Sequence, residues 1–330
     1  MLLKKIKNTQ IFWNLINKIS KYIPKRYFLS IPDEIIVEVT NICNLKCPVC
    51  PTNFLMKREK GCMELDILKL IIDDFKNIEK KPRINFGFSG EPLINRKLPE
   101  LIEYAKRKGH FTYLSTNCTL LDHDISLNLI ESGLDLIYLA IDGFSPNSHE
   151  KYRVGSNFEQ IKNNIENFII LRRKLGKHTP KVIIQTLITS YSEKEIPSII
   201  NWAKKIGADG IFLKSFSLGS YTNENMKKKY LHFLPKDQKY RRKQSNVYKT
   251  ICTAPLKQSL VFWNGNLGLC CVDFNNIVKL PNIKTRGFLD TFFSEEVIKI
   301  RKAAFMKELS LCKNCSIGNA DYYGEKIFFN

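Results

Sequence analysis

The stretch IIVEVTNICNLKCPVC, residues 35–50, decides how the rest of the chain is interpreted. It joins an apolar, β-branched run typical of a strand to a loop in which Cys43, Cys47 and Cys50 follow a C-x3-C-x2-C spacing. A [4Fe–4S] cluster normally takes four protein thiolates, so three on one loop leave one iron free to bind another ligand. Zinc sites favour C-x2-C pairs and four ligands, so the spacing predicts an open iron–sulfur cluster rather than zinc.

Beyond this loop, short β-branched runs alternate with segments in which apolar residues recur at helical spacing. The expected strands are residues 35–40, 84–89, 111–116, 136–141, 182–189 and 210–215, with helices around 65–78, 98–105, 161–171 and 196–203. This alternation predicts right-handed βαβ crossovers and a parallel sheet. Six such units can form either an open doubly wound sheet or a partial barrel.

Polar and cluster-forming residues recur where these strands end. The cysteine loop follows the first strand, and the next three end at Ser89-Gly90-Glu91-Pro92, Ser115-Thr116-Asn117 and Asp142-Gly143. In parallel barrels, ligands bind at the loops that follow the carboxyl ends of the strands. Packing alone explains four such loops in a row poorly, so they predict a cofactor site at this edge of the sheet.

The cysteine spacing and the ordered residues after it resemble the radical S-adenosylmethionine (SAM) superfamily over about residues 34–215. The resemblance implies an α/β fold, a partial (β/α)6 parallel barrel with a small C-terminal iron–sulfur domain. It implies that the open iron of a cluster on Cys43, Cys47 and Cys50 chelates SAM, and that reduction yields a 5′-deoxyadenosyl radical that abstracts hydrogen from the substrate. SAM contacts are implied for Gly90, Glu91, Pro92, Ser115, Asn117, Asp142 and Arg153.

Two positions depart from the family pattern. Val49 stands where an aromatic residue often contacts the adenine, and Cys118 stands where a glycine often follows Thr-Asn. A thiol near the SAM pocket is a candidate hydrogen-atom donor, which makes Cys118 a candidate catalytic residue of an epimerase. Packing is the commoner role of a free cysteine, and we favour it.

A second cysteine group lies in the C-terminal third, where Cys252 and Cys270 flank Gly265 in a C-x12-G-x4-C pattern and Cys312 and Cys315 form a C-x2-C pair. The pattern resembles the twitch domain, a shortened SPASM domain, and implies one auxiliary [4Fe–4S] cluster with four cysteine ligands. A four-cysteine zinc site is the rival. Cys271 is an alternative to Cys270, and otherwise Cys62 and Cys271 are expected to be small buried hydrophobes.

Composition limits the class of protein and its partners. The 330 residues carry 52 Lys and Arg against 32 Asp and Glu, a formal net charge of +20. Residues 1–30 hold seven basic and no acidic side chains, and residues 227–243 hold a second basic cluster.

An apolar helical face within residues 12–23 predicts a basic amphipathic helix that packs on the barrel or lies on an anionic membrane surface. Ten cysteines without a secretion signal predict a cytoplasmic protein, either free in the cytoplasm or peripheral to the inner face of the membrane.

These features predict three parts: the N-terminal segment 1–33, a radical SAM core at 34–215 and an auxiliary-cluster domain at 216–330.

The favoured function is hydrogen abstraction from a small polar, sugar- or cyclitol-like substrate, with oxidation through the auxiliary cluster, because twitch enzymes include aminocyclitol dehydrogenases. The alternatives are a peptide-modifying maturase or epimerase and a non-enzymatic electron-transfer or sensor protein. A low-potential electron donor such as flavodoxin or ferredoxin is the expected partner; nucleic acid is not, because no recognition module accompanies the basic run.

Overall fold

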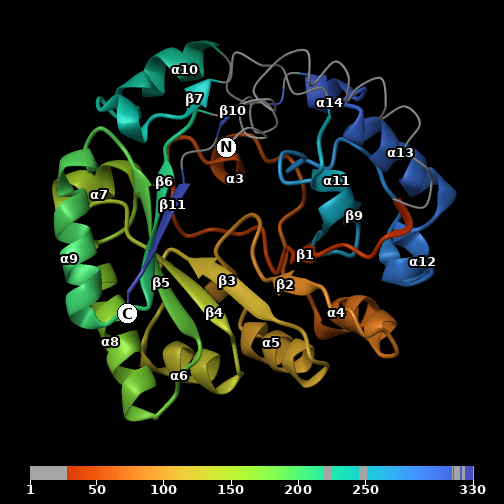
Figure 1. Ribbon diagram of the computed structural model, residues 1–330, viewed down its shortest axis with the longest axis horizontal. Helices are drawn as coiled ribbons and strands as arrows, with labels where there is room; N and C mark the ends of the chain where they lie inside the picture. Colours follow the sequence, from red (N-terminus) through yellow and green to blue (C-terminus); the bar gives the residue numbers. More distant parts are fainter. Residues whose placement is uncertain are drawn as a thin grey trace, which may run out of the picture.

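The computed structural model describes residues 28–218, 224–244, 251–313, 315, 320–321 and 324–329. Six strands pair in parallel, each with the next along the chain (Figure 1). They are β1 (Glu34–Val37), β2 (Arg83–Asn85), β3 (Thr112–Thr116), β4 (Leu136–Ala140), β5 (Lys181–Ile188) and β6 (Gly210–Ser215). All six strands expected from the sequence are confirmed, and together they form the expected partial parallel barrel.

Helices follow the strands and cover the outer face of the sheet (Figure 1). They are α4 (Leu65–Ile72), α5 (Leu98–Arg107), α6 (His123–Glu131), α7 (Pro146–Tyr152), α8 (Phe158–Lys174) and α9 (Ile196–Ile206). Apolar positions three and four apart turn one face of each long helix to the sheet, as Leu98, Leu101 and Ile102 do in α5. The four helical segments expected from periodicity are confirmed, whereas α6 and α7 were not predicted.

The C-terminal part of the chain extends the same sheet at both edges. β8 (Gln258–Val261) pairs in parallel with β1, and β9 (Leu267–Gly268) pairs antiparallel with β8. Between them Gly265, with a φ of 86°, forms a tight turn after Asn264. At the other edge, β11 (Gly324–Phe328) pairs antiparallel with β6. The sheet order is therefore β11-β6-β5-β4-β3-β2-β1-β8-β9.

The other elements lie mostly in the C-terminal part. The helices are α3 (Pro51–Phe54), α10 (Glu224–Tyr230), α11 (Ala254–Lys257), α12 (Phe288–Phe292), α13 (Glu295–Phe305) and α14 (Ser310–Lys313). Strands β7 (Lys243–Gln244) and β10 (Ala320–Asp321) form a separate two-stranded sheet. Within the described residues, no helix is long and apolar enough to span a membrane. The amphipathic helix expected within residues 12–23 lies outside the described part of the chain.

Buried contacts join the C-terminal part to the segment that follows the cysteine loop. Arg58 donates from Nη1 and Nη2 to the fully buried Glu38 carboxylate at 2.9 and 2.5 Å. The same guanidinium donates to the Phe274 carbonyl at 2.6 Å and lies 4.1 Å from the centroid of the Phe262 ring. One charged side chain therefore joins the residue that follows β1 to the C-terminal part.

Candidate functional site

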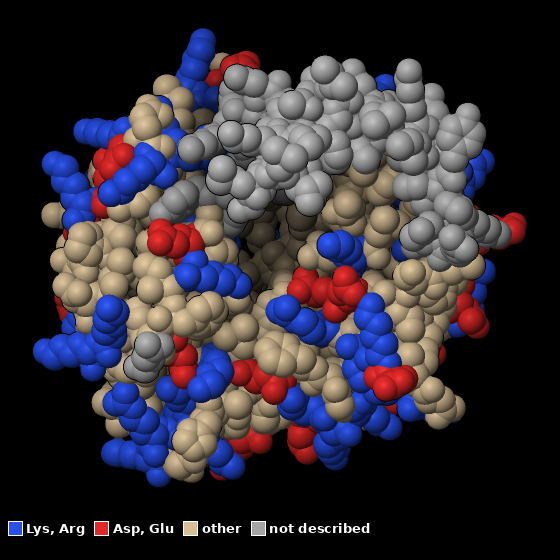
Figure 2. Space-filling view, viewed as in Figure 1, with Lys and Arg blue, Asp and Glu red and all other residues tan. Residues whose placement is uncertain are grey.

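The three cysteines of the first loop line one cavity of about 710 Å³ that extends from the carboxyl ends of the strands into the interior of the barrel. Figure 2 shows a hollow near the centre of the visible face, with charged side chains around it. Burial raises the pKa of the Cys47 thiol to about 11; the Arg153 guanidinium opposes this, and the neighbouring Cys50 and Cys43 add to it. The thiols are thus close enough to interact, and their thiolates need a positive metal centre to stabilise them.

Gly90 and Glu91 bring the loop after β2 into contact with the start of the cysteine loop. Gly90 has a φ of 73°, and a Cβ there would lie 2.6 Å from the carbonyl oxygen of Ile42 and 2.7 Å from that of Thr40. The next amide, Glu91 N–H, donates to the same Ile42 carbonyl at 2.8 Å. This backbone-to-backbone approach requires glycine, because any other side chain would push the cysteine loop away.

The Glu91 carboxylate is buried and fully engaged. It accepts hydrogen bonds from Thr116 Oγ1 at 2.7 Å, Asn117 N–H at 2.8 Å and Leu93 N–H at 3.2 Å. Burial raises the pKa of Glu91, and these hydrogen bonds oppose that rise. Glu91 therefore ties the loops after β2 and β3 together while it and Pro92 line the cavity.

Ser115 and Asn117 bring the end of β3 to the same cavity. Asn117 Nδ2 donates to Asn44 Oδ1 at 3.0 Å, which connects β3 to the residue after Cys43. Gln185 Nε2 donates to Ser115 Oγ at 3.3 Å. Both residues expected from the end of this strand therefore lie at the cavity wall.

Arg153 reaches the cavity, and Asp142 lies behind it. The Asp142 carboxylate is fully buried, accepts from Arg153 Nε at 2.5 Å and from Leu187 N–H at 2.7 Å, and is absent from the cavity lining. Burial alone would lower the pKa of Arg153, but the Asp142 and Cys47 charges outweigh it and raise that pKa. Asp142 is thus a positioning residue for Arg153 in this structure rather than a group facing the cavity.

Cys118 lies in the hydrophobic core. Its side chain is fully buried, it does not line the cavity, and burial raises the pKa of its thiol. Its φ of 64° is the backbone conformation that explains why glycine is frequent at this position. This placement gives no support to a hydrogen-donor role, and we do not propose one.

The second cysteine group also gathers in space. Burial raises the pKa of the Cys312 thiol to about 11, and the nearby Cys252 and Cys315 raise it further. Burial is also the main reason why the pKa of the Cys270 thiol is raised, and the nearby Cys271, Cys312 and Cys315 raise it further. All four expected ligands therefore lie near one another, and Cys271 lies beside them with an exposed side chain, so the expectation that it is buried was wrong. In the part of the chain that the structure describes, no set of three or more side chains is already arranged in metal-binding geometry.

The interior of the barrel adds polar residues that sequence reasoning missed. The inward-facing side chains that line the cavity below the cysteines include Glu34, Arg83, Tyr113, Tyr138, Gln185, Lys214, Gln258 and Lys326. A period-two pattern was available on the strands, because Arg83 and Asn85, Tyr113 and Ser115, and Phe212 and Lys214 alternate with buried apolar residues. No local signal could place Gln258 or Lys326 there.

The chain belongs to the radical SAM superfamily, whose family model matches residues 37–203. The model of the SPASM iron-sulfur cluster-binding domain matches residues 252–316. Membership implies the use of SAM and iron–sulfur clusters, and the thiols gathered at one cavity beside Arg153 fit that requirement.

Curated relatives match over only part of their length. The chain is 26% identical, over 54% of itself and 50% of the relative, to the tungsten-containing aldehyde ferredoxin oxidoreductase cofactor-modifying protein of Pyrococcus furiosus. It is 30% identical, over 52% of itself and 55% of the relative, to a probable GTP 3′,8-cyclase of Methanococcus maripaludis. The chain therefore spans about half the length of these curated relatives.

Solved structures share the fold at low identity. BtrN in complex with AdoMet and 2-DOIA superposes with a TM-score of 0.54 at 18% identity, covering 87% of this chain and 94% of BtrN. SuiB of Streptococcus suis bound to the precursor peptide SuiA superposes with a TM-score of 0.61 at 17% identity, covering 88% and 71%. These likenesses confirm the partial barrel.

Proposed function

We propose that this chain is an oxidoreductase of the radical SAM class that abstracts hydrogen from a small polar, sugar- or cyclitol-like substrate. The observation that carries the proposal is one cavity in which three cysteines and Arg153 lie above a floor of polar side chains from the barrel strands. A substrate inside the barrel would lie directly below the cofactor site. We further propose the three-part division at residues 1–33, 34–215 and 216–330, and a cytoplasmic location.

We assign the open cluster to Cys43, Cys47 and Cys50, and the auxiliary cluster to Cys252, Cys270, Cys312 and Cys315. When bound, these groups and SAM would supply a hydrogen-abstracting radical and an electron acceptor. An alcohol would then lose one hydrogen atom, which becomes part of 5′-deoxyadenosine, together with one proton and one electron. A low-potential donor such as flavodoxin or ferredoxin would supply the electron for each SAM cleavage. The electron taken from the substrate would leave the auxiliary cluster for the oxidised donor, which returns the chain to its starting state.

The residues of the chain itself prepare this cavity. Gly90 lets two loops meet, and Glu91 locks them to β3. Arg153 offers a guanidinium that suits the carboxylate of SAM, and Asp142 holds its Nε. Asn117, fixed by Asn44, presents an amide edge to the same space. These contacts support Gly90, Glu91, Pro92, Ser115, Asn117 and Arg153 as the SAM-binding set, with Asp142 acting through Arg153.

A peptide substrate is the second candidate, because SuiB and anSMEcpe have been solved with peptides in complexes that share this fold. The observation that favours it here is the exposed pair Lys228 and Lys229 on α10, which could bind an acidic leader. The superpositions do not distinguish a small polar substrate from a peptide substrate, because matches at 17% and 19% identity show the fold alone.

The test is anaerobic reconstitution followed by a screen for substrate-dependent 5′-deoxyadenosine. We expect sugar or cyclitol substrates to give a product lighter by two hydrogens, without solvent deuterium at the reacting carbon. Formation of 5′-deoxyadenosine only with peptides would move the assignment to the second candidate. A reconstituted chain that never cleaves SAM would overturn the enzymatic proposal.

A further inference from the structure

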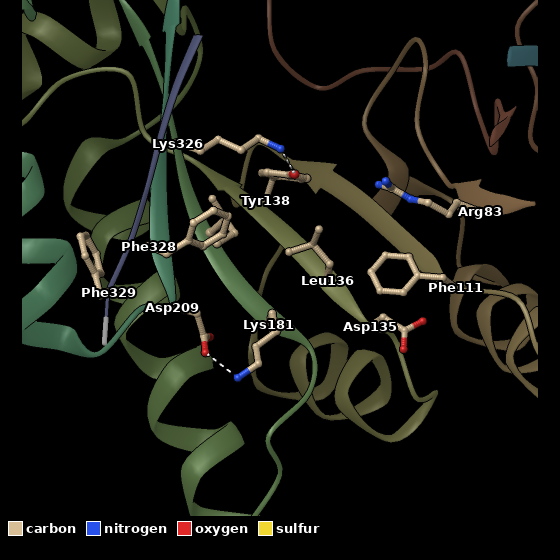
Figure 3. Close-up of a pocket in the computed structure, with 11 residues that line it drawn as sticks. Arg83, Phe111, Asp135, Leu136, Tyr138, Lys181, Asp209, Lys326, Phe328 and Phe329 are labelled. Carbon is tan, nitrogen blue, oxygen red and sulfur yellow. Dashed lines mark hydrogen bonds and ion pairs between the residues drawn. The ribbon is translucent and has the colours of Figure 1, made fainter. Parts of the chain in front are cut away.

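Three side chains, Arg83, Tyr138 and Lys326, separate two cavities inside the barrel, and we call them the floor of the site. The upper cavity, described above, contains the three cysteines; a lower one of about 700 Å³ opens at the amino ends of the strands. The two share Arg83 from β2, Tyr138 from β4 and Lys326 from β11. In Figure 3 Arg83 and Lys326 approach Tyr138 from opposite sides. These three side chains therefore form the boundary between the cofactor cavity and the lower opening.

The two floor cations are held by aromatic rings and not by carboxylates. Arg83 lies 4.9 Å from the ring centroid of Tyr113 and 5.3 Å from that of Phe111. Lys326 Nζ donates to the Tyr138 hydroxyl at 3.3 Å and lies 4.9 Å from the Phe212 centroid. Across the described ranges, neither has a salt bridge, although other cations near the lower cavity do, such as Lys181 with Asp209 at 3.0 Å.

A third cation, Lys214, lines the wall of the upper cavity, and within the described residues it too has no ion pair. Burial lowers the pKa of Lys214; Asp142 opposes this, and Arg153 and Arg242 add to it. An anion bound nearby would offset the free-energy cost of burying the charged Lys214 ammonium, because its opposite charge stabilises a desolvated cation.

The carboxylates of this cavity are already occupied. Glu34 accepts from the Tyr113 hydroxyl and from Gln258 Nε2 at 3.0 Å. Glu91 accepts the three hydrogen bonds described above, and Asp142, which lies behind the cavity wall, holds Arg153. The cavity below the cysteines therefore carries more positive than negative charge, with cationic donors at its floor that have no protein acceptor among the described carboxylates.

We infer that the substrate is a small anion, a carboxylate or phosphate ester, whose charged group binds between Arg83 and Lys326 with the Tyr138 hydroxyl beside it. The inference rests on the proposed function and names the substrate class of the same site. Arg83 and Lys326 would select against an aminocyclitol, because its ammonium groups would be repelled by these two positive charges. A planar guanidinium and a lysine are side chains that recognise carboxylate and phosphate.

The test measures binding to the full reconstituted chain with SAM, by calorimetry at constant ionic strength. The probes are benzoate, phenyl phosphate, benzyl alcohol and benzylamine, which share one aromatic ring and differ in charge. We expect the two anions to bind and benzylamine not to, and the tighter anion identifies the acidic group. Benzylamine or benzyl alcohol binding as tightly as both anions would overturn the inference, and this comparison needs no variant.

Variants then locate the site. Arg83→Gln with Lys326→Gln should weaken benzoate or phenyl phosphate at least about tenfold, as expected for the loss of charged hydrogen-bond donors. Arg83→Lys with Lys326→Arg should restore most of the affinity. The matched control is Lys181→Gln, which removes a cation at the lower cavity that already has Asp209 as partner. Wild-type affinity in the double glutamine variant, with an unchanged melting temperature, would place the anion elsewhere and contradict the inference.

The outcomes separate this inference from the proposed function. Anion selectivity is measured without turnover, so it can hold even if no 5′-deoxyadenosine forms. Conversely, substrate-dependent SAM cleavage with a neutral or cationic compound would support the enzyme and reject the anionic substrate.

Discussion

At the scale of single residues, Asp142 shows how a buried carboxylate acts through a neighbour. Its two oxygens hold Arg153 Nε and Leu187 N–H, and its side chain is 1% exposed against 19% for Arg153. Breaking a buried ion pair by removing one charge leaves the other uncompensated.

Asp142→Asn should therefore destabilise the protein by about 3 kcal/mol, measured by urea unfolding. It should also weaken SAM binding, because Arg153 loses its fixed orientation. The control is Asp124→Asn, whose side chain is 93% exposed and which should change neither quantity. Unchanged SAM affinity in Asp142→Asn would show that Arg153 does not need this partner.

His149 is a buried titratable group beside the same aspartate. Its Nδ1 accepts from the Asp142 backbone N–H at 3.1 Å, and its Nε2 is buried without a hydrogen-bond partner among the residues that the structure describes. Burial lowers the pKa of His149 to about 4. The folded state therefore holds a neutral ring at pH values where the unfolded chain, near pKa 6.5, binds a proton.

Because the folded pKa is lowered, this stability is complete above pH 6.5 and is lost as the pH falls towards 4. Between pH 7.5 and 5.5, His149 should account for a loss of about 1 kcal/mol in the free energy of unfolding. Urea unfolding of the wild type and His149→Gln at several pH values measures this. Parallel pH profiles of the two proteins would refute the assignment.

At the scale of elements, the loops of the two proposed clusters are joined by hydrogen bonds. Asn275 Oδ1 accepts from Lys57 N–H at 2.8 Å, and Asn275 Nδ2 donates to the Leu55 carbonyl at 2.7 Å. Leu55 follows Cys50 closely and Asn275 follows Cys270 closely, so one amide side chain sets the distance between the two cysteine regions.

Asn275→Ala should lower the free energy of unfolding by about 2 kcal/mol, because two hydrogen bonds are lost, one at the half-buried Leu55 carbonyl and one at the exposed Lys57 amide. Hydrogen exchange should accelerate at the Lys57 amide, which loses its acceptor. Asn163→Ala, at an exposed position on α8, is the matched control. Unaltered exchange around Lys57 in Asn275→Ala would mean that this contact does not hold the loops together.

At the scale of the whole molecule, the two cysteine groups predict a metal content. After reconstitution we expect about eight irons per chain, as two four-iron clusters. Replacing Cys43, Cys47 and Cys50 with alanine should leave about four and abolish SAM cleavage. Replacing Cys312 and Cys315 should retain SAM cleavage and impair turnover. Elemental analysis that finds one tightly bound zinc with only four irons would exclude the auxiliary cluster.

The sequence alone predicted the six barrel strands, four of the helices between them, the cysteine loop and most of the residues that line the cavity beside that loop. These follow from local information: β-branched runs, helical spacing of apolar residues, and short motifs at strand ends. The strand predictions at 136–141 and 210–215 lie within a residue of β4 and β6. Gly90 was expected at this edge of the sheet, and the structure adds that a positive φ and a close backbone approach require glycine there.

Only the tertiary structure decided which distant segments complete the site. β8 joins β1, and β11 joins β6 from the far end of the chain, bringing Gln258 and Lys326 into the barrel. Asp142 stands behind Arg153 and Cys118 lies in the core, although both follow strand ends. The physical reason is that edge pairing and side-chain direction depend on which partners are free in three dimensions. Residue spacing along the chain carries no record of that choice.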